Sequence, residues 1–146
     1  MSAIERDHAG GRDKVIYTAK TRTSGGRENG IARSSDGRLD VKLSLPRSAR
    51  IGTNPEQLLG AGWSACLESS IAIAAGKRRI VVPEVTIDAE IDLHEADGGY
   101  FIGARFNVSL PGLDRDIAKS LIEEAQQICT YSKATRGNID VVFNLV

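Results

Sequence analysis

The chain has 146 residues, of which 41% are hydrophobic, and this is enough for one domain with its own buried core. Lysine plus arginine and aspartate plus glutamate both number 19, so no surplus of charge favours binding to nucleic acid or to anionic lipid. The start of the chain is polar and unlike a signal sequence, and the most apolar run, near residues 71–75, is short for a membrane span. We therefore expect a cytoplasmic protein without nucleic-acid or membrane partners.

The first part of the chain predicts a tail followed by strands. Residues 1–14 are rich in charge and glycine and indicate a flexible tail, which leaves a single domain over residues 15–146. Glycine-containing turns then separate three strands, at residues 15–19, 30–33 and 39–45. The third is the clearest, because apolar and polar residues alternate along it.

A long helix is expected next, from residue 55 to about Gly76. Thr53 or Asn54 can cap its start, Pro55 suits the first turn, and Glu56 places negative charge at the positive end of the helix dipole. The residues that follow are apolar or small on almost every side. This composition predicts a central helix that is buried all round.

The last part of the chain predicts a hairpin, a second helix and a final strand. Alternating residues at 85–93 and 102–110 flank a glycine turn, which is typical of a β-hairpin. Asp114 can cap a second helix whose apolar stripe ends near Cys129, and residues 139–145 form a terminal strand. Strands, helix, hairpin, helix and strand in this order favour an α+β fold with largely antiparallel sheet.

Cys66 and Cys129 are the only cysteines, and they are the first candidates for chemistry. A purely structural disulfide is not expected in a reducing compartment, so each is either an inert core thiol or a redox group. Both lie on apolar helix faces, but this periodicity leaves a contact between them open. The two histidines, His8 and His94, are not spaced with the cysteines as zinc ligands, so no metal site is expected.

If Cys66 is reactive, a group from another part of the chain must lower the pKa of its thiol. It lies about three turns into its helix, where the dipole no longer acts, and apolar surroundings raise the pKa of a thiol. Arg27, which follows Gly25 and Gly26 in a turn, is a candidate cation, and Glu56 could position it by a bidentate contact. The alternatives are a solvated surface arginine and a glutamate that only stabilises the helix start.

Several longer and shorter motifs stand out along the chain. The longer ones are GTNPEQL at 52–58, AGWSAC at 61–66 and CTYSKATRGNID at 129–140, and the shorter ones are YTA at 17–19, GGR at 25–27 and SSDG at 34–37. Together they resemble the organic hydroperoxide resistance (Ohr) family, which belongs to the OsmC-like superfamily. The likeness covers the chain from about residue 15 to its end.

The resemblance implies a thiol peroxidase that reduces alkyl or fatty-acid hydroperoxides to alcohols without a cofactor. It implies that Cys66 is the peroxidatic cysteine and Cys129 the resolving one, and that Arg27 and Glu56 activate the thiolate. It also implies an intertwined homodimer with largely antiparallel sheets around two central helices and active sites at the subunit interface. A dithiol, such as a dihydrolipoyl group, is the implied reductant.

The sequence also departs from the family pattern around these four positions. Thr130 replaces a common proline, Gln126 stands where a histidine is common, and Trp63 and Leu67 occupy positions more often filled by tyrosine and phenylalanine. Two other functions are considered: an OsmC-like module that binds a small apolar molecule, with incidental thiols, and a thiol enzyme of another OsmC branch. The motif at residues 129–140 favours the Ohr family over that branch.

Overall fold

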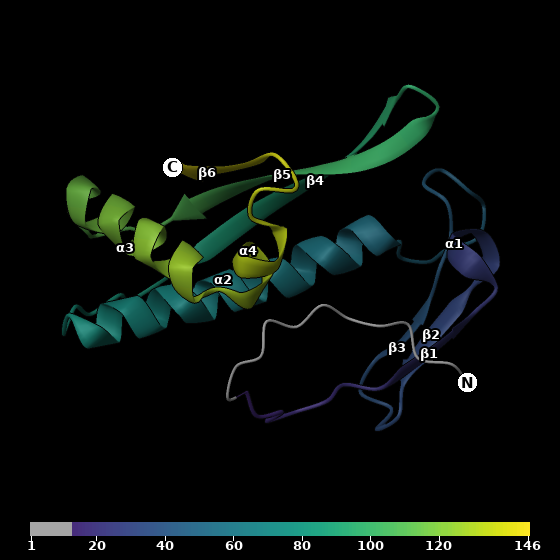
Figure 1. Cartoon of the computed structure of the whole chain (residues 1–146), viewed down its shortest axis with the longest axis horizontal. Coiled ribbons are helices and arrows are strands. Elements are labelled where there is room, and N and C mark those ends of the chain that lie inside the picture. Colours follow the sequence, from purple (N-terminus) through teal and green to yellow (C-terminus); the bar gives the residue numbers. More distant parts are fainter. Residues whose placement is uncertain (1–12) are drawn as a thin grey trace.

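The computed structural model describes residues 13–146, so the expected tail at residues 1–14 lies almost entirely outside the described part of the chain. The fold is α+β, as the sequence indicates, and its elements are shown in Figure 1. In chain order they are β1 (Thr21–Ser24), α1 (Gly26–Asn29), β2 (Ile31–Ser34), β3 (Asp40–Lys42), α2 (Pro55–Lys77), β4 (Thr86–Ala96), β5 (Gly99–Ser109), α3 (Arg115–Ile128), α4 (Thr130–Thr135) and β6 (Val141–Leu145).

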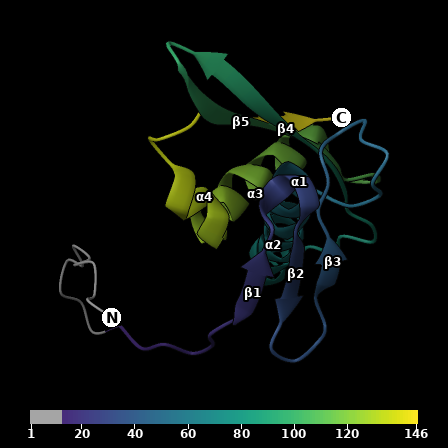
Figure 2. The same cartoon turned by 90° about the vertical axis from the view of Figure 1, so that its right-hand side faces the viewer.

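The strands form two separate sheets of three strands each. The smaller sheet has the order β1-β2-β3 and the larger one the order β4-β5-β6, and all their pairs are antiparallel except β5 with β6. Helices α2 and α3 lie against one face of the larger sheet, and the smaller sheet stands beyond the start of α2 (Figure 1). Seen from that end, α1 lies in front of α2 (Figure 2).

The predicted hairpin is confirmed with its turn. Strands β4 and β5 pair from Thr86 with Ser109 to Ala96 with Gly99. Asp97 and Gly98 both have positive φ, at 52° and 76°. This backbone is what a two-residue hairpin turn requires, and an Asp-Gly pair supplies it at little steric cost.

The start of α2 follows the predicted cap. The Asn54 side chain accepts a hydrogen bond from the Gln57 backbone N–H at 2.9 Å, and Pro55 occupies the first turn. The buried residues recur every three or four positions and define one face of the helix. They are Gly60, Trp63, Leu67, Ser70, Ile71, Ala74 and Ala75.

The expectation that α2 is buried all round is wrong for the single chain. Ala61, Ala65, Ala72 and Ile73 lie on its other side and are exposed, because the sheet and α3 cover only one face. The helix is also long and apolar enough to cross a membrane, which corrects the expectation that no segment is. A core helix passes the same test of length and composition, and α2 packs against α3 and β4.

One core joins the long helix to the larger sheet and α3. Trp63, Leu67 and Ile71 of α2 meet Phe106 and Val108 of β5 in it. The Trp63 and Phe106 ring centroids are 4.7 Å apart. The rest of the fully enclosed cluster comprises Ala104, Leu110, Ala118, Ile122, Ala125 and Cys129.

Two local expectations need correction. No strand forms at residues 15–19, where Ile16 is 90% exposed, because no neighbouring strand in the described chain pairs with this segment. The strand expected over 39–45 is limited to β3, after which Leu43 makes a single parallel bridge with Thr53. Two short helices are not predicted by the sequence: α1, where a turn is expected, and α4, directly after Cys129.

Leu67 provides a test of the core. It is fully buried, so Leu67→Ala should lower the free energy of unfolding by about 2–5 kcal/mol through lost burial and the cavity left behind. Val142→Ala, at a site 48% exposed on β6, should cost about 0.5 kcal/mol or less. Chemical denaturation at matched protein concentration measures both values, and equal losses would contradict the described core.

Candidate functional site: a cysteine pair and an arginine–glutamate pair

The two cysteines meet where α3 ends and α4 begins. Cys129 has an extended backbone, with φ −61° and ψ 120°, which interrupts the helical path between α3 and α4. Its side chain is fully buried in the main core cluster, and the half-buried Cys66 of α2 packs against that cluster. Both are free thiols. The packing of α2 against α3 and α4 therefore brings together residues that are far apart in the sequence.

The start of α4 lies against the Cys66 sulfur and forms a hydrogen bond with it. The Thr130 Oγ1 atom lies 3.4 Å from Cys66 Sγ. Burial raises the pKa of the Cys66 thiol, but hydrogen bonds from the Thr130 and Cys129 side chains and from the Thr130 and Tyr131 backbone outweigh it, so the pKa is lower than usual. Within one chain, neutral hydrogen-bond donors thus stabilise the Cys66 thiolate, a role for which the sequence suggested a cation.

Helix α4 is fixed against α2 by an indole and a phenol ring. Trp63 Nε1 donates a hydrogen bond to Ser132 Oγ at 3.3 Å, and the Trp63 and Tyr131 rings stack with centroids 6.2 Å apart. A Cβ atom at Gly62 would lie 2.7 Å from the Tyr131 hydroxyl, so the glycine permits this close approach. Sequence patterns did not reveal these contacts, because they join residues about 70 positions apart.

Arg27 and Glu56 form the second pair. Gly25 and Gly26 both have positive φ, which turns the chain so that α1 carries Arg27 toward the start of α2. Arg27 Nη1 donates to Glu56 Oε1 at 3.0 Å and to Oε2 at 3.4 Å. The expected contact is present, but one guanidinium nitrogen bridges both carboxylate oxygens instead of two nitrogens making parallel bonds.

Arg50 holds the loop that approaches α2. Its Nε donates to the Leu43 carbonyl at 3.0 Å and its Nη2 to the Gly30 carbonyl at 3.2 Å. Gly30 directly follows α1, and a Cβ atom there would lie 2.1 Å from the Gly26 carbonyl oxygen. Arg50 therefore ties the 43–53 loop to the turn that carries Arg27, a role the sequence did not indicate.

A cavity of about 1080 Å³ lies beside the arginine–glutamate pair. It is open to solvent and is lined by α1, the loop before α2, the first half of α2 and the β4–β5 hairpin, and most of its lining is apolar. The lining residues are Arg27, Glu28, Leu45, Pro46, Asn54, Glu56, Gln57, Gly60, Ala61, Ser64, Ile87, Ala89, Ile91, Leu93 and Tyr100.

The two pairs do not meet within one chain. Cys66 does not line the cavity, and it follows Glu56 by ten residues along α2. At the rise of an α-helix this spacing is about 15 Å. The structure therefore joins Cys66 with Cys129 and Arg27 with Glu56, and it separates the thiols from the guanidinium.

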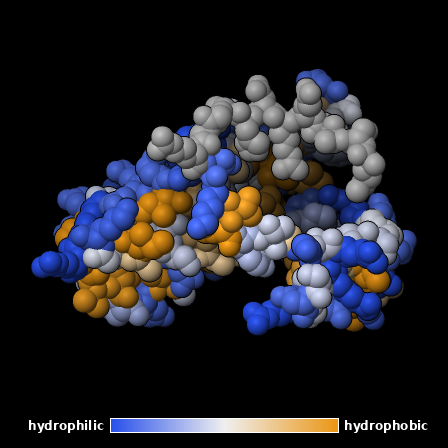
Figure 3. Space-filling view, turned by 60° about the horizontal axis from the view of Figure 1, so that its bottom comes forward, coloured by the Kyte–Doolittle hydropathy of each residue, from blue (hydrophilic) through white to orange (hydrophobic). Residues whose placement is uncertain are grey.

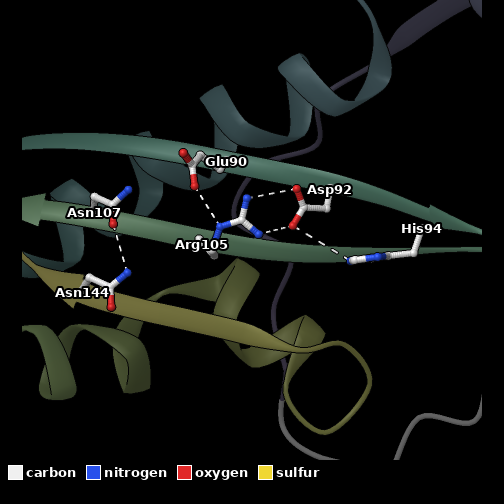
Figure 4. Close-up of polar contacts among 6 residues, drawn as sticks. All are labelled: Glu90, Asp92, His94, Arg105, Asn107 and Asn144. Atoms are coloured by element: carbon white, nitrogen blue, oxygen red, sulfur yellow. Dashed lines mark hydrogen bonds and ion pairs between the residues drawn. The ribbon is translucent and has the colours of Figure 1, made fainter.

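The polar residues of the larger sheet form a separate network on its outer face (Figure 4). Arg105 contacts both Glu90 and Asp92, and His94 Nε2 lies 4.0 Å from Asp92 Oδ2. Arg105 of β5 thus pairs with two carboxylates of the neighbouring strand β4. Among residues 13–146 no three His, Cys, Asp or Glu side chains are placed to hold a metal ion, and His8 lies outside that range.

Comparisons with known proteins identify the family and agree with the fold. The OsmC-like protein family matches residues 47–144. The chain is 43% identical over 138 residues to the organic hydroperoxide resistance protein of Xanthomonas axonopodis pv. citri, which covers 91% of this chain and 96% of that protein. The crystal structure of the organic hydroperoxide resistance protein OhrB of Bacillus subtilis matches with a TM-score of 0.85 at 39% identity, covering 90% of this chain and 100% of that one.

The lowered pKa of Cys66 predicts the pH dependence of its alkylation. A lower pKa means that the thiolate forms at lower pH, so the Cys66 rate should reach half its maximum at a lower pH in the folded protein than in guanidinium-unfolded protein. Peptide mass spectrometry after brief iodoacetamide treatment measures each cysteine separately. The fully buried Cys129 should react more slowly than Cys66 in the folded protein. A midpoint for Cys66 that is equal or higher on folding would contradict the hydrogen bonding.

Proposed function

Because the chain belongs to the organic hydroperoxide resistance family of OsmC-like proteins, we propose that it is a cytoplasmic thiol peroxidase that reduces organic hydroperoxides to alcohols. The observation that carries this proposal is the meeting of Cys66 and Cys129 at the start of α4. One thiol is partly accessible with a lowered pKa, and the other is buried beside it. This is the pairing that a peroxidatic and a resolving cysteine need.

The reaction proceeds in two steps at these sulfurs. The Cys66 thiolate attacks the distal peroxide oxygen, the O–O bond breaks, and the alkoxide leaves and takes a proton to become the alcohol. Cys66 is then a sulfenic acid. The Cys129 thiol condenses with it, which forms the disulfide and releases water. A dithiol restores both thiols by exchange and becomes a disulfide itself. The family resemblance supports a dihydrolipoyl group as this dithiol.

Arg27 and Glu56 complete the site from a second copy of the chain. The guanidinium stabilises the thiolate and the charge that develops on the leaving oxygen, and Glu56 orients it. Cys66 lies too far from Arg27 of its own chain, whereas Arg27 of the partner subunit can approach it across the interface. The exposed small residues Ala61, Ala65 and Ala72 of α2 support such an interface, because they allow a second helix close approach.

Exposed apolar residues give independent support for the homodimer. Val15, Ile16 and Tyr17 form an extended segment that is at least 78% exposed and pairs with no strand in the described chain. On the face shown in Figure 3, patches of hydrophobic side chains lie between the hydrophilic ones. Hydrophobic side chains also line the hollow beside the smaller sheet. Apolar surface of this kind marks an interaction site. An intertwined dimer would cover it.

The substrate class follows from the cavity and from the relatives. The relatives are named for resistance to organic hydroperoxides, and the cavity beside Arg27 is large and mostly apolar. It suits an alkyl or fatty-acid chain better than hydrogen peroxide. The same cavity favours a second candidate, a module that binds an apolar molecule and whose thiols are incidental.

Intact mass after peroxide treatment separates these two functions. One equivalent of cumene hydroperoxide should remove two hydrogens from the reduced protein as the disulfide forms. Cys129→Ser should instead gain one oxygen as the sulfenic acid of Cys66, and Cys66→Ser should show no fast change and no turnover. An unchanged mass of the wild-type protein would support the binding module, and a Cys66→Ser variant that keeps its activity would remove Cys66 from its role.

A hybrid dimer tests whether the site is shared between chains. Co-expression with two affinity tags yields a dimer of one Arg27→Ala chain and one Cys66→Ser chain. Each homodimer should be strongly impaired, but the hybrid should recover one working site, in which the intact cysteine meets the intact arginine of the partner subunit. A hybrid as inactive as both parents would show that each chain uses its own Arg27.

A further inference from the structure

Thr130 is the residue outside the four proposed site positions that lies against the reacting sulfur. Its Oγ1 is 3.4 Å from Cys66 Sγ, although the two residues are 64 positions apart. We propose, on the basis of the proposed function, that Thr130 is a further catalytic residue, whose hydroxyl holds Cys66 as a thiolate ready for the hydroperoxide. Thr130 is thus a donor from the same chain as the sulfur, and in the proposed dimer the guanidinium of the partner subunit would add to it.

The position of Thr130 is set by the fold and not by local flexibility. It is the first residue of α4, directly after the fully buried Cys129. The Lys133 N–H donates to the Cys129 carbonyl at 3.0 Å, and Trp63 holds the same turn through Ser132. The Thr130 side chain is thereby directed toward α2. A donor held in place in this way needs no rearrangement when charge appears on the sulfur.

The two side chains that hydrogen-bond Cys66 approach from different surroundings. Thr130 is exposed and Cys129 is buried. When the sulfur is a thiolate, only the hydroxyl can supply the proton of the Thr130–Cys66 hydrogen bond, because a thiolate is solely an acceptor. Cys129 must give up its own hydrogen bond when it attacks the sulfenic acid, whereas Thr130 takes no part in the disulfide. Stabilisation of the thiolate and resolution of the sulfenic acid are therefore divided between neighbouring residues.

The backbone of Thr130 adds a second donor. Against the effect of burial, the Thr130 side chain and the N–H groups of Thr130 and Tyr131 lower the pKa of Cys66, together with Cys129. A proline, which is common in the family at this position, has neither a hydroxyl nor an N–H. Proline is tolerated in the first position of a helix, so the contribution of both donors can be removed without breaking α4.

Substitutions of Thr130 test this inference through the pH profile of Cys66 alkylation. Thr130→Val keeps the shape and loses the hydroxyl, so Cys66 should be alkylated about three- to tenfold more slowly at pH 7, with its profile displaced to higher pH. Thr130→Ser should recover most of the rate, and Thr130→Pro should be at least as slow as Thr130→Val. Sulfenic acid formation in a Cys129→Ser background should follow the same order.

Thr135→Val is the matched control. It makes the same substitution on the same helix, but the Thr135 hydroxyl donates to the Tyr131 carbonyl at 2.9 Å and not to the sulfur. Its Cys66 profile should stay that of the wild type. A Thr130→Val profile equal to the wild type, or a Thr130→Ser variant as slow as Thr130→Val, would overturn the assignment. A shifted alkylation profile in a protein that cumene hydroperoxide does not oxidise would support the hydrogen bond and overturn the peroxidase function alone.

Discussion

The contact between the middle of α2 and the start of α4 is the interaction on which the proposed chemistry depends. It places the Cys66 sulfur among donors from Thr130, Cys129 and Tyr131 and so offsets the cost of ionising a thiol in an apolar environment. The extended backbone at Cys129 is the feature that allows it, because a continuous helix would carry the following residues past α2. Trp63, packed in the core and bonded to α4, fixes the distance.

The same long helix organises both halves of the proposed site. Its first turn carries Glu56, which receives Arg27, and its middle carries Cys66. Because about 15 Å of rigid helix separates them, the charge and the nucleophile cannot meet in one chain. In the proposed dimer, two copies with their α2 helices side by side would remove this difficulty, since the arginine of one chain would lie near the cysteine of the other. The exposed small residues on the uncovered face of α2 and the unpaired segment at residues 15–19 are consistent with that assembly.

Much of the fold could be predicted from the sequence because its signals are local. The Asn54 cap, the Asp97-Gly98 turn and the alternation along the hairpin each depend on a few neighbouring residues, and the structure contains all three. Features that depend on distant partners escaped prediction. The six-residue α4 owes its place to Trp63, and the apolar segment at residues 15–19 pairs with no strand in the described chain. The motifs named Arg27 and Glu56 together, and the ten-residue spacing of Glu56 and Cys66 along one predicted helix already implied their separation from the thiols.

The most direct test of this account is to locate the disulfide after peroxide treatment. Light and isotopically heavy chains are co-refolded, oxidised with an organic hydroperoxide, alkylated and digested without reduction. The contact at α4 predicts that Cys66 and Cys129 peptides are linked only as light with light or heavy with heavy, within one chain. Mixed light–heavy pairs, or no link between these two peptides, would contradict it.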